Sequence, residues 1–176
     1  FLDWLAFKVQ NPIERGFAII MIAEDSFGIG RSWLGKMLRL MFQAKVKTAT
    51  MAQLIGKGTS AEQNSNDWMT ECQLLVVEEA KADITKEEFY TGFETFKQNV
   101  DTSVGQIRVN PKYGKTRNDL MFFNTLIFSN HTDALVIPEN DRRVCVMTNA
   151  TKMREPEYYE RLHASVTPAE AAKLYW

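Results

Sequence analysis

The stretch Ala18–Phe42 reads AIIMIAE, DSFGIGRS and WLGKMLRLMF in succession, and the fold of the chain depends on it. The continuous apolar run at its start predicts a strand that is buried on both faces. Two glycines and several polar residues then predict a loop, after which apolar residues recur at helical spacing. Strand, glycine-bearing loop and helix start form the layout of a phosphate-binding loop, in which backbone N–H groups hold the anion.

The loop fits the phosphate-binding pattern G-x-x-x-x-G-K-[ST] only in part. Gly30 and Ser32 fit, whereas Asp25 replaces the first glycine and Arg31 replaces the lysine. On this segment alone, a nucleotide-binding loop and an ordinary strand-to-helix turn both remain open. The candidate nucleotide-binding residues are Ser26, Phe27, Gly28, Ile29, Gly30, Arg31, Ser32 and Trp33.

Composition bounds the class of protein without naming an activity. The 176 residues suit one α/β domain, and a net charge of −1 gives no global signal for nucleic acid. Cys72 and Cys145 lie in apolar runs and have neither disulfide nor zinc spacing. No apolar run reaches the ~18 residues that span a bilayer, and no signal peptide is visible. Because the chain begins with Phe1, we expect a domain excised from a longer protein.

Three apolar runs end in polar residues that phosphate chemistry uses. The first leads into the glycine-bearing loop, the second ends at Glu78 and Glu79, and the third, 120–129, ends at Asn130. In an open α/β sheet, ligands bind outside the carboxyl ends of the strands. We therefore expect these three strand ends to converge, if the strands are parallel neighbours.

The remaining segments predict helices, strands and one hairpin. Thr85 is an N-cap candidate with Glu88 at capping-box spacing, and an apolar stripe of three phenylalanines follows. Residues 106–128 predict a hairpin with a basic tip that carries Lys112, Tyr113, Lys115 and Arg117. We expect further helices at 1–10, 155–166 and 168–175, a connector at 13–16, one helical turn at 67–71, and strands at 45–49, 72–77, 134–137 and 144–148.

This ordered set resembles the superfamily 3 helicases of the AAA+ class over residues 17–148. The resemblance is strongest to the helicase domains of phage and viral primase-helicase replication proteins, the D5-like group. It implies an α/β fold of the P-loop NTPase type with a mainly parallel sheet, helices on both faces and a β-hairpin inserted before the sensor strand. A helix at 1–12 would precede this core, and helices at 154–176 would follow it.

The resemblance also implies roles for individual residues. Ser32 and Glu78 would hold Mg²⁺, Glu79 would activate the attacking water, and Asn130 would sense the γ-phosphate. Arg142 or Arg143 would be an arginine finger that reaches the neighbouring subunit. The basic hairpin tip, residues 112–117, would grip single-stranded DNA, with lysine and arginine on phosphates and Tyr113 stacked on a base.

The implied cofactors are ATP and Mg²⁺, and the implied assembly is a homo-oligomeric ring, usually a hexamer, without a membrane. A primase or primase-polymerase domain would lie upstream on the same chain, in the cytoplasm of a phage- or virus-infected host cell. The function implied is an ATP-dependent DNA helicase motor. The alternative is a nucleotide-binding or DNA-clamp module that does not hydrolyse ATP, since Arg31 and Asp25 depart from the pattern.

Each of these residues also has an ordinary structural interpretation. Glu78 and Glu79 could be a solvated strand end, and the basic tip could be a soluble hairpin. Arg142 and Arg143 could form an ion pair with Asp141. The two histidines, His131 and His163, have no ligand spacing around them and are treated as structural.

Overall fold

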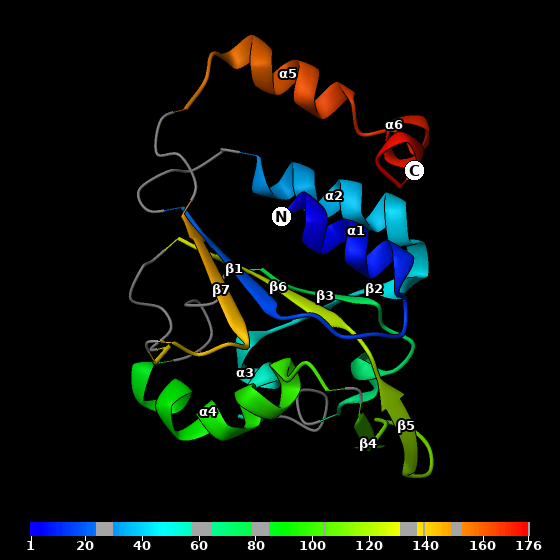
Figure 1. Cartoon of the computed structure of the whole chain (residues 1–176), viewed down its shortest axis with the longest axis vertical. Helices are drawn as coiled ribbons and strands as arrows, with labels where there is room; N and C mark the ends of the chain where they lie inside the picture. The colour runs from blue at the N-terminus through cyan, green and yellow to red at the C-terminus, as the bar shows by residue number, and fades with distance from the viewer. Residues whose placement is uncertain are drawn as a thin grey trace.

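The computed structural model describes residues 1–23, 30–57, 65–78, 85–103, 105–130, 137–138, 140–148 and 153–175. Its centre is a five-stranded sheet in the order β2-β3-β6-β1-β7, in which every neighbouring pair is parallel (Figure 1). The strands are β1 (Ala18–Ile22), β2 (Val46–Ala49), β3 (Leu74–Val77), β6 (Asn124–Ser129) and β7 (Val144–Thr148). The predicted mainly parallel sheet is confirmed.

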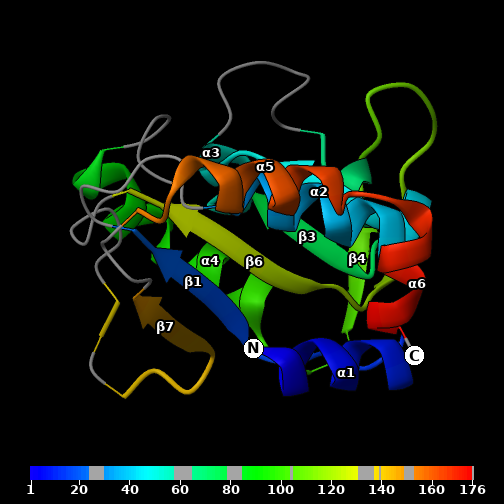
Figure 2. The ribbon, with the colours of Figure 1, turned by 90° about the horizontal axis from the view of Figure 1, so that it is seen from above.

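The apolar runs of the sequence became the interior strands of this sheet. All residues of β1, β3 and β6 are buried, as expected for strands with both faces covered. The first strand, β1, lies inside the sheet; the chain then crosses to the edge strand β2 and returns through β3 to β6. As a result β1 and β6, the first and third apolar runs of the sequence, are neighbours. Figure 2 shows the arrowheads of β1, β6 and β7 ending toward the same edge.

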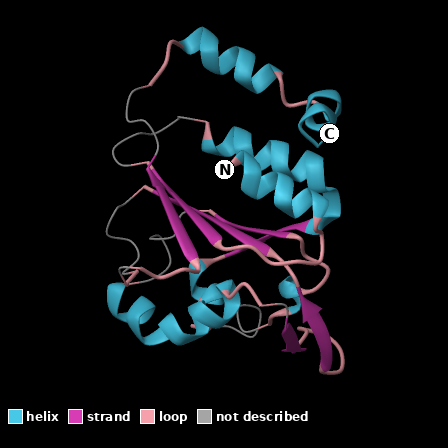
Figure 3. Ribbon diagram, viewed as in Figure 1, coloured by secondary structure: helices cyan, strands magenta, loops and turns pink. Residues whose placement is uncertain are grey.

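Helices cover both faces, as predicted. One face carries α1 (Leu2–Gln10), α2 (Arg31–Phe42) and α6 (Pro168–Tyr175), while α5 (Pro156–Ala164) lies further out over α2 (Figures 1 and 3). The other face carries the one-turn helix α3 (Met51–Leu54) and α4 (Lys86–Val100). Two short 3₁₀ turns, η1 (Gln43–Lys45) and η2 (Asp67–Met69), flank the edge strand β2 and precede β3.

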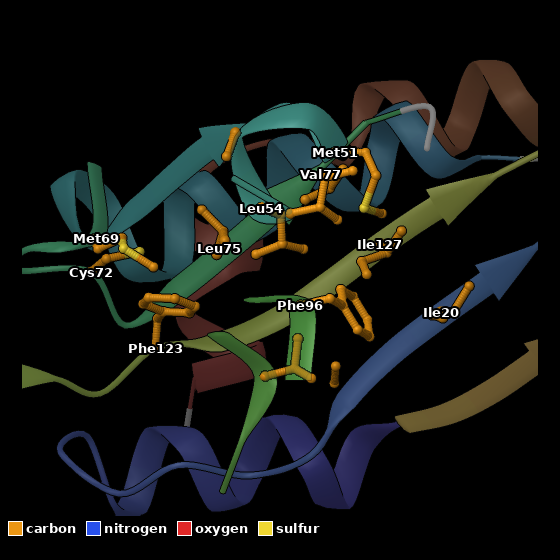
Figure 4. Close-up of a cluster of buried hydrophobic side chains, with 14 of the residues drawn as sticks. Ile20, Met51, Leu54, Met69, Cys72, Leu75, Val77, Phe96, Phe123 and Ile127 are labelled. Carbon is orange, nitrogen blue, oxygen red and sulfur yellow. The ribbon is translucent and has the colours of Figure 1, made fainter. Parts of the chain in front are cut away.

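Each face of the sheet has its own apolar cluster. Beneath α3 and α4, Leu75, Val77 and Ile127 pack against Phe96 and Leu54 (Figure 4). The predicted capping box at the start of α4 is present, because Thr85 Oγ1 accepts from the Glu88 backbone N–H and the Glu88 side chain accepts from Thr85. The phenylalanine stripe of α4 is part of the core, as expected for an amphipathic helix.

The predicted hairpin exists, but its second strand ends earlier than the sequence indicated. It pairs β4 (Gly105–Val109) with β5 (Arg117–Met121), antiparallel, as a separate two-stranded sheet. The prediction of one strand over 120–129 is wrong, because the chain leaves the hairpin at Phe122 and Phe123 and joins the main sheet at Asn124. Carbonyl groups at this break accept hydrogen bonds from cationic side chains of the N-terminal segment.

Lys8 of α1 is one of these cations, and its side chain is completely buried. Its Nζ donates to the carbonyls of Pro12, Glu14 and Phe122. Burial lowers the pKa of this ammonium group to about 8. The helix expected at 1–10 is present, and the structure adds that Lys8 lies on its buried side.

Arg15 is the second cation, in the segment that the sequence indicated as a plain connector. Its guanidinium donates to the carbonyls of Asn99, Ser103 and Phe123. Burial lowers its pKa to about 10. Lys8 and Arg15 together hold both roots of the hairpin against the N-terminal segment, since residues 99–103 precede β4 and Phe123 follows β5.

Candidate functional site

The amino end of α2 is built to receive an anion. Gly30 is the N-cap with a φ of 102°, in the left-handed region that disfavours other residues, and a Cβ there would lie 3.3 Å from Leu162 Cδ2. The Leu34 N–H closes the first helical turn on the Gly30 carbonyl, at 3.0 Å. The N–H groups of the preceding helical residues have no acceptor within the helix, and the first turn carries no acid. This end of α2 therefore presents donors and a positive dipole.

The sheet brings Asn130 to the same place. Asn130 directly follows β6, which is the neighbour of β1, with Met21 opposite Phe128 in register. The Arg31 guanidinium donates to Asn130 Oδ1. Two of the predicted site residues, 99 positions apart in the sequence, are thus in contact.

A small cavity of about 130 Å³ lies next to this contact, and it is lined by Arg31, Ser32, Glu78 and Phe128. Glu78 follows β3, the other neighbour of β6. The structure therefore brings Ser32, Glu78 and Arg31 around one cavity at the carboxyl edge of the sheet, which is the convergence expected of parallel strands.

Glu78 forms an ion pair that the sequence did not reveal. Its Oε1 lies 2.7 Å from Arg39 Nη2 on α2, and both side chains are about half exposed. An exposed pair of this kind contributes little to stability, of order 0–1 kcal/mol, and can be exchanged for another cation. The partners are 39 residues apart, so no local pattern could have paired them.

The donor set suits Mg²⁺ bound jointly with a phosphate. A hydroxyl and a carboxylate are hard oxygen ligands, and Mg²⁺ usually takes only one or two protein ligands together with phosphate and water. Among the residues that the structure describes, no three His, Cys, Asp or Glu side chains gather into a metal site of their own.

Several predicted site residues lie outside the described part of the chain. These are Ser26, Phe27, Gly28, Ile29 and Glu79, together with Asp25. Trp33 is described, and its Nε1 donates to Ser165 Oγ at 3.1 Å. Its side chain therefore contacts the segment between α5 and α6, and only its backbone belongs to the first turn of α2.

Arg142 and Arg143 lie at the opposite edge of the sheet, just before β7. The backbone there is fixed by the Ala18 N–H, which donates to the Arg143 carbonyl at 2.8 Å. The Arg143 side chain is paired with Asp101 at 3.2 Å and Asp141 at 3.3 Å, and these hydrogen bonds raise its pKa. Arg143 thus forms the structural ion pair that was the alternative interpretation, whereas the Arg142 side chain is exposed.

The basic tip of the hairpin is exposed and lies away from the cavity between β3 and α2 (Figure 1). Tyr113 is 84% exposed, and Lys112 Nζ lies 5.4 Å from the centre of its ring. Lys115 and Arg117 are also exposed, with Arg117 Nε 3.5 Å from Asp119. Exposed cations on a projecting loop suit contacts with phosphates of a nucleic-acid strand.

A larger hollow of about 830 Å³ lies between α1, α2 and α6, and its lining is mostly apolar. None of the strand ends reaches it, and Lys173 is its one cationic lining residue among those described. Separately, no helix in the described ranges is both long and apolar enough to traverse a lipid bilayer.

Comparisons with known proteins identify a family and a fold. Residues 25–143 match the family described as "Family of unknown function (DUF5906)". No curated protein matches the chain in sequence. Two solved apo structures of the NrS-1 C terminal region are similar, with TM-scores of 0.77 and 0.73 at 22% and 21% identity. They cover 97% and 99% of this chain, which spans only 40% of either solved chain. The likeness establishes a shared fold.

Proposed function

This chain belongs to the DUF5906 family, whose function is unknown, and we propose that it is the ATP-dependent motor domain of a DNA helicase in phage-type replication. One observation carries the proposal. The amino end of α2, the acid after β3 and the asparagine after β6 lie together at the carboxyl edge of one parallel sheet. Phosphoryl transfer from ATP requires this combination of donors, metal ligands and a polar contact to the terminal phosphate.

In the proposed reaction, the first-turn N–H groups of α2 and the Arg31 guanidinium hold the phosphates. Ser32 and Glu78 hold Mg²⁺, which when bound offsets the charge that develops on the phosphate oxygens. Asn130 orients the γ-phosphate, and Glu79 accepts a proton from the attacking water. Because Arg31 donates to Asn130 Oδ1, the two side chains lie close enough together that both would contact the same γ-phosphate.

The arginine finger must come from a second subunit. Arg142 and Arg143 precede β7 at its amino end, whereas the phosphate site is at the carboxyl edge, so neither can serve the site of its own chain. We assign the finger to Arg142, because Arg143 is held by two carboxylates. In this proposal the finger completes the site of a neighbouring subunit, so the subunits would form a ring, with the hairpin tips toward single-stranded DNA.

A second candidate is a nucleotide-binding clamp without hydrolysis. The ion pair between Glu78 and Arg39 favours it, since a metal ligand that is already neutralised attracts Mg²⁺ less strongly. Binding of ATP and Mg²⁺ without turnover, with hydrolysis appearing in Arg31→Lys, would support this candidate over the first.

The experiment that tests the motor is the rate of ATP hydrolysis with and without single-stranded DNA. We expect DNA to stimulate hydrolysis, and Glu79→Gln to reduce it at least about 100-fold, as for loss of a general base. Glu157→Gln removes an exposed acid of α5 and should leave the rate unchanged. Equal rates in wild type and Glu79→Gln would refute hydrolysis by this site.

A further inference from the structure

A second pocket lies at the root of the hairpin, far from the phosphate site. It has a volume of about 320 Å³ and lies between α3, η2, α4 and β4. Its lining includes Gln53, Asn66, Trp68, Thr95, Asn99 and Asn110. Among the described residues that line it, none carries a charge, so it offers nothing to an isolated phosphate or a metal ion.

The polar groups of this pocket are held in fixed positions. Asn99 is 8% exposed, and its Nδ2 donates to the Leu54 carbonyl at 2.7 Å, so the amide oxygen points away from Leu54 as an acceptor. Gln53 Oε1 accepts from the Thr50 N–H at 2.9 Å, which leaves Nε2 as a donor. A donor and an acceptor from rigid helices suit the edge of a flat heteroaromatic ring.

An aromatic wall completes the pocket. Trp68 is partly buried, its Nε1 donates to the Ser65 carbonyl at 3.1 Å, and its ring packs against Phe123 with centroids 6.1 Å apart. Its orientation is therefore fixed, and the part of the indole that lines the pocket is a platform for stacking. Stacking on aromatic side chains is how proteins bind unpaired bases.

The pocket is tied to the hairpin by Asn66. Its Nδ2 donates to the Arg108 carbonyl at 2.9 Å, and its Oδ1 accepts from the Asn110 N–H at 2.6 Å. Asn110 lines the pocket and precedes Lys112 by two residues, a span of at most about 7 Å. A nucleotide at the tip can therefore place its phosphate near the lysines and its base in the pocket.

We propose that this pocket binds one unstacked base of the single-stranded DNA that the hairpin tip holds by its phosphates. The inference rests on the proposed function only in so far as it takes single-stranded DNA as the ligand. It assigns base contact to the hairpin root, where Trp68 lies, in addition to the exposed tip. The pocket would add affinity without strict sequence preference, because stacking accepts every base.

The test compares two labelled oligomers of equal length and charge by fluorescence anisotropy. One is oligothymidylate, and the other has the same backbone with every base replaced by hydrogen. We expect wild type to bind the intact strand about tenfold more tightly. Thr95→Phe fills the pocket, and the double variant Gln98→Ala/Asn110→Ala removes two polar side chains of its lining. Each variant should reduce this ratio to about threefold or less. A ratio of one in wild type, or an unchanged ratio in both variants, would overturn the inference.

A matched control separates the pocket from the tip. The double variant Lys112→Gln/Lys115→Gln should weaken both oligomers by the same factor and reduce the salt dependence of binding, because it removes phosphate contacts only. Photo-crosslinking to strands that carry 5-iodouracil should label Trp68, and label confined to Tyr113 would contradict the inference. Preference for the intact strand without ATP hydrolysis would refute the proposed motor function but support base binding by the pocket. DNA-stimulated hydrolysis without that preference would support the motor function and refute base binding by the pocket.

Discussion

At the scale of single residues, two glycines inside helices differ in what surrounds them. A Cβ at Gly92 of α4 would lie 2.7 Å from Ile55 Cβ and 2.9 Å from the Ile55 carbonyl oxygen. The end of α3 can therefore pack this closely against α4 only because residue 92 has no side chain. A Cβ at Gly35 of α2 would lie 3.4 Å from the end of the Arg39 side chain, which can move.

These surroundings decide the sign of the change to alanine. Alanine in a helix is favoured over glycine by about 1 kcal/mol, but overpacking against backbone costs about 1–3 kcal/mol. Gly92→Ala should therefore lower the free energy of unfolding by up to about 2 kcal/mol, and Gly35→Ala should raise it or leave it unchanged. Urea denaturation measures both, and a stabilised Gly92→Ala variant would contradict the close contact of α3 and α4.

At the scale of elements, the two arginines before β7 show how adjacent residues can serve different purposes. Arg143 joins Asp101 at the end of α4 to Asp141, and the Ser103 hydrogen bonds and this arginine lower the pKa of Asp101. These two ion pairs of Arg143 thus connect the end of α4 to the amino end of β7. Arg142 remains exposed on the same short segment.

The two alanine variants should therefore behave differently. Arg143→Ala should lower the thermal midpoint, since Asp101 and Asp141 lose a shared partner, by an amount equivalent to about 1 kcal/mol. Arg142→Ala should keep the wild-type midpoint but abolish DNA-stimulated ATP hydrolysis, because the proposed finger would act on the neighbouring subunit. A destabilised Arg142→Ala together with a stable, fully active Arg143→Ala would contradict both the structural role of Arg143 and the finger role of Arg142.

Much at this scale could be predicted from the sequence, because the signals are local. Continuous apolar runs predicted the buried strands, and the capping-box spacing of Thr85 and Glu88 predicted the start of α4. The turn-rich basic segment between two extended runs predicted the hairpin before β6. The end of β5 could not be predicted, since it depends on carbonyls at Phe122 and Phe123 that bind side chains over 100 residues earlier. The pairing of Glu78 with Arg39 could not be predicted for the same reason, because the two residues are 39 positions apart and no local sequence pattern links them.

At the scale of the whole molecule, buried cations tie the N-terminal segment to the hairpin. Lys8 donates to three carbonyls and Arg15 to three others, so both roots of the hairpin are fixed to the segment before β1. The proposed role of the hairpin, which is to pull on DNA, would need such a rigid base, because force on the tip would otherwise be lost in local unfolding. The candidate phosphate site lies at the carboxyl ends of the central strands, whereas the hairpin is a separate two-stranded sheet that joins the amino end of β6 (Figure 1).

Lys8→Met tests this anchor. It keeps the apolar stem but removes the ammonium donor from the carbonyls of Pro12, Glu14 and Phe122, so we expect a loss of about 1.5–3 kcal/mol in the free energy of unfolding. Burial lowers the folded pKa of Lys8 from 10.5 to about 8. Between these values unfolding takes up a proton, so stability due to Lys8 rises with pH.

The difference in unfolding free energy between wild type and Lys8→Met should therefore grow between pH 8 and 10.5. Most of the contribution of Cys72 cancels in this comparison, because burial raises its thiol pKa to about 12 and Lys8 is the smallest of the causes that lower it. Denaturant titrations at several pH values measure it. A difference that shrinks over this range would mean that Lys8 is not desolvated in the folded protein.

The most direct test of the central claim is the equilibrium binding of labelled ATP with Mg²⁺ to wild type, Arg31→Ala, Ser32→Ala and Arg39→Ala. All three substitutions lie on α2, and Arg31 and Arg39 carry the same charge. A phosphate site at the amino end of α2 predicts binding that is weakened about tenfold or more by Arg31→Ala and Ser32→Ala. It predicts undiminished binding in Arg39→Ala, which frees Glu78 for the metal. Equal affinity in all four proteins, or no binding by wild type, would contradict the account.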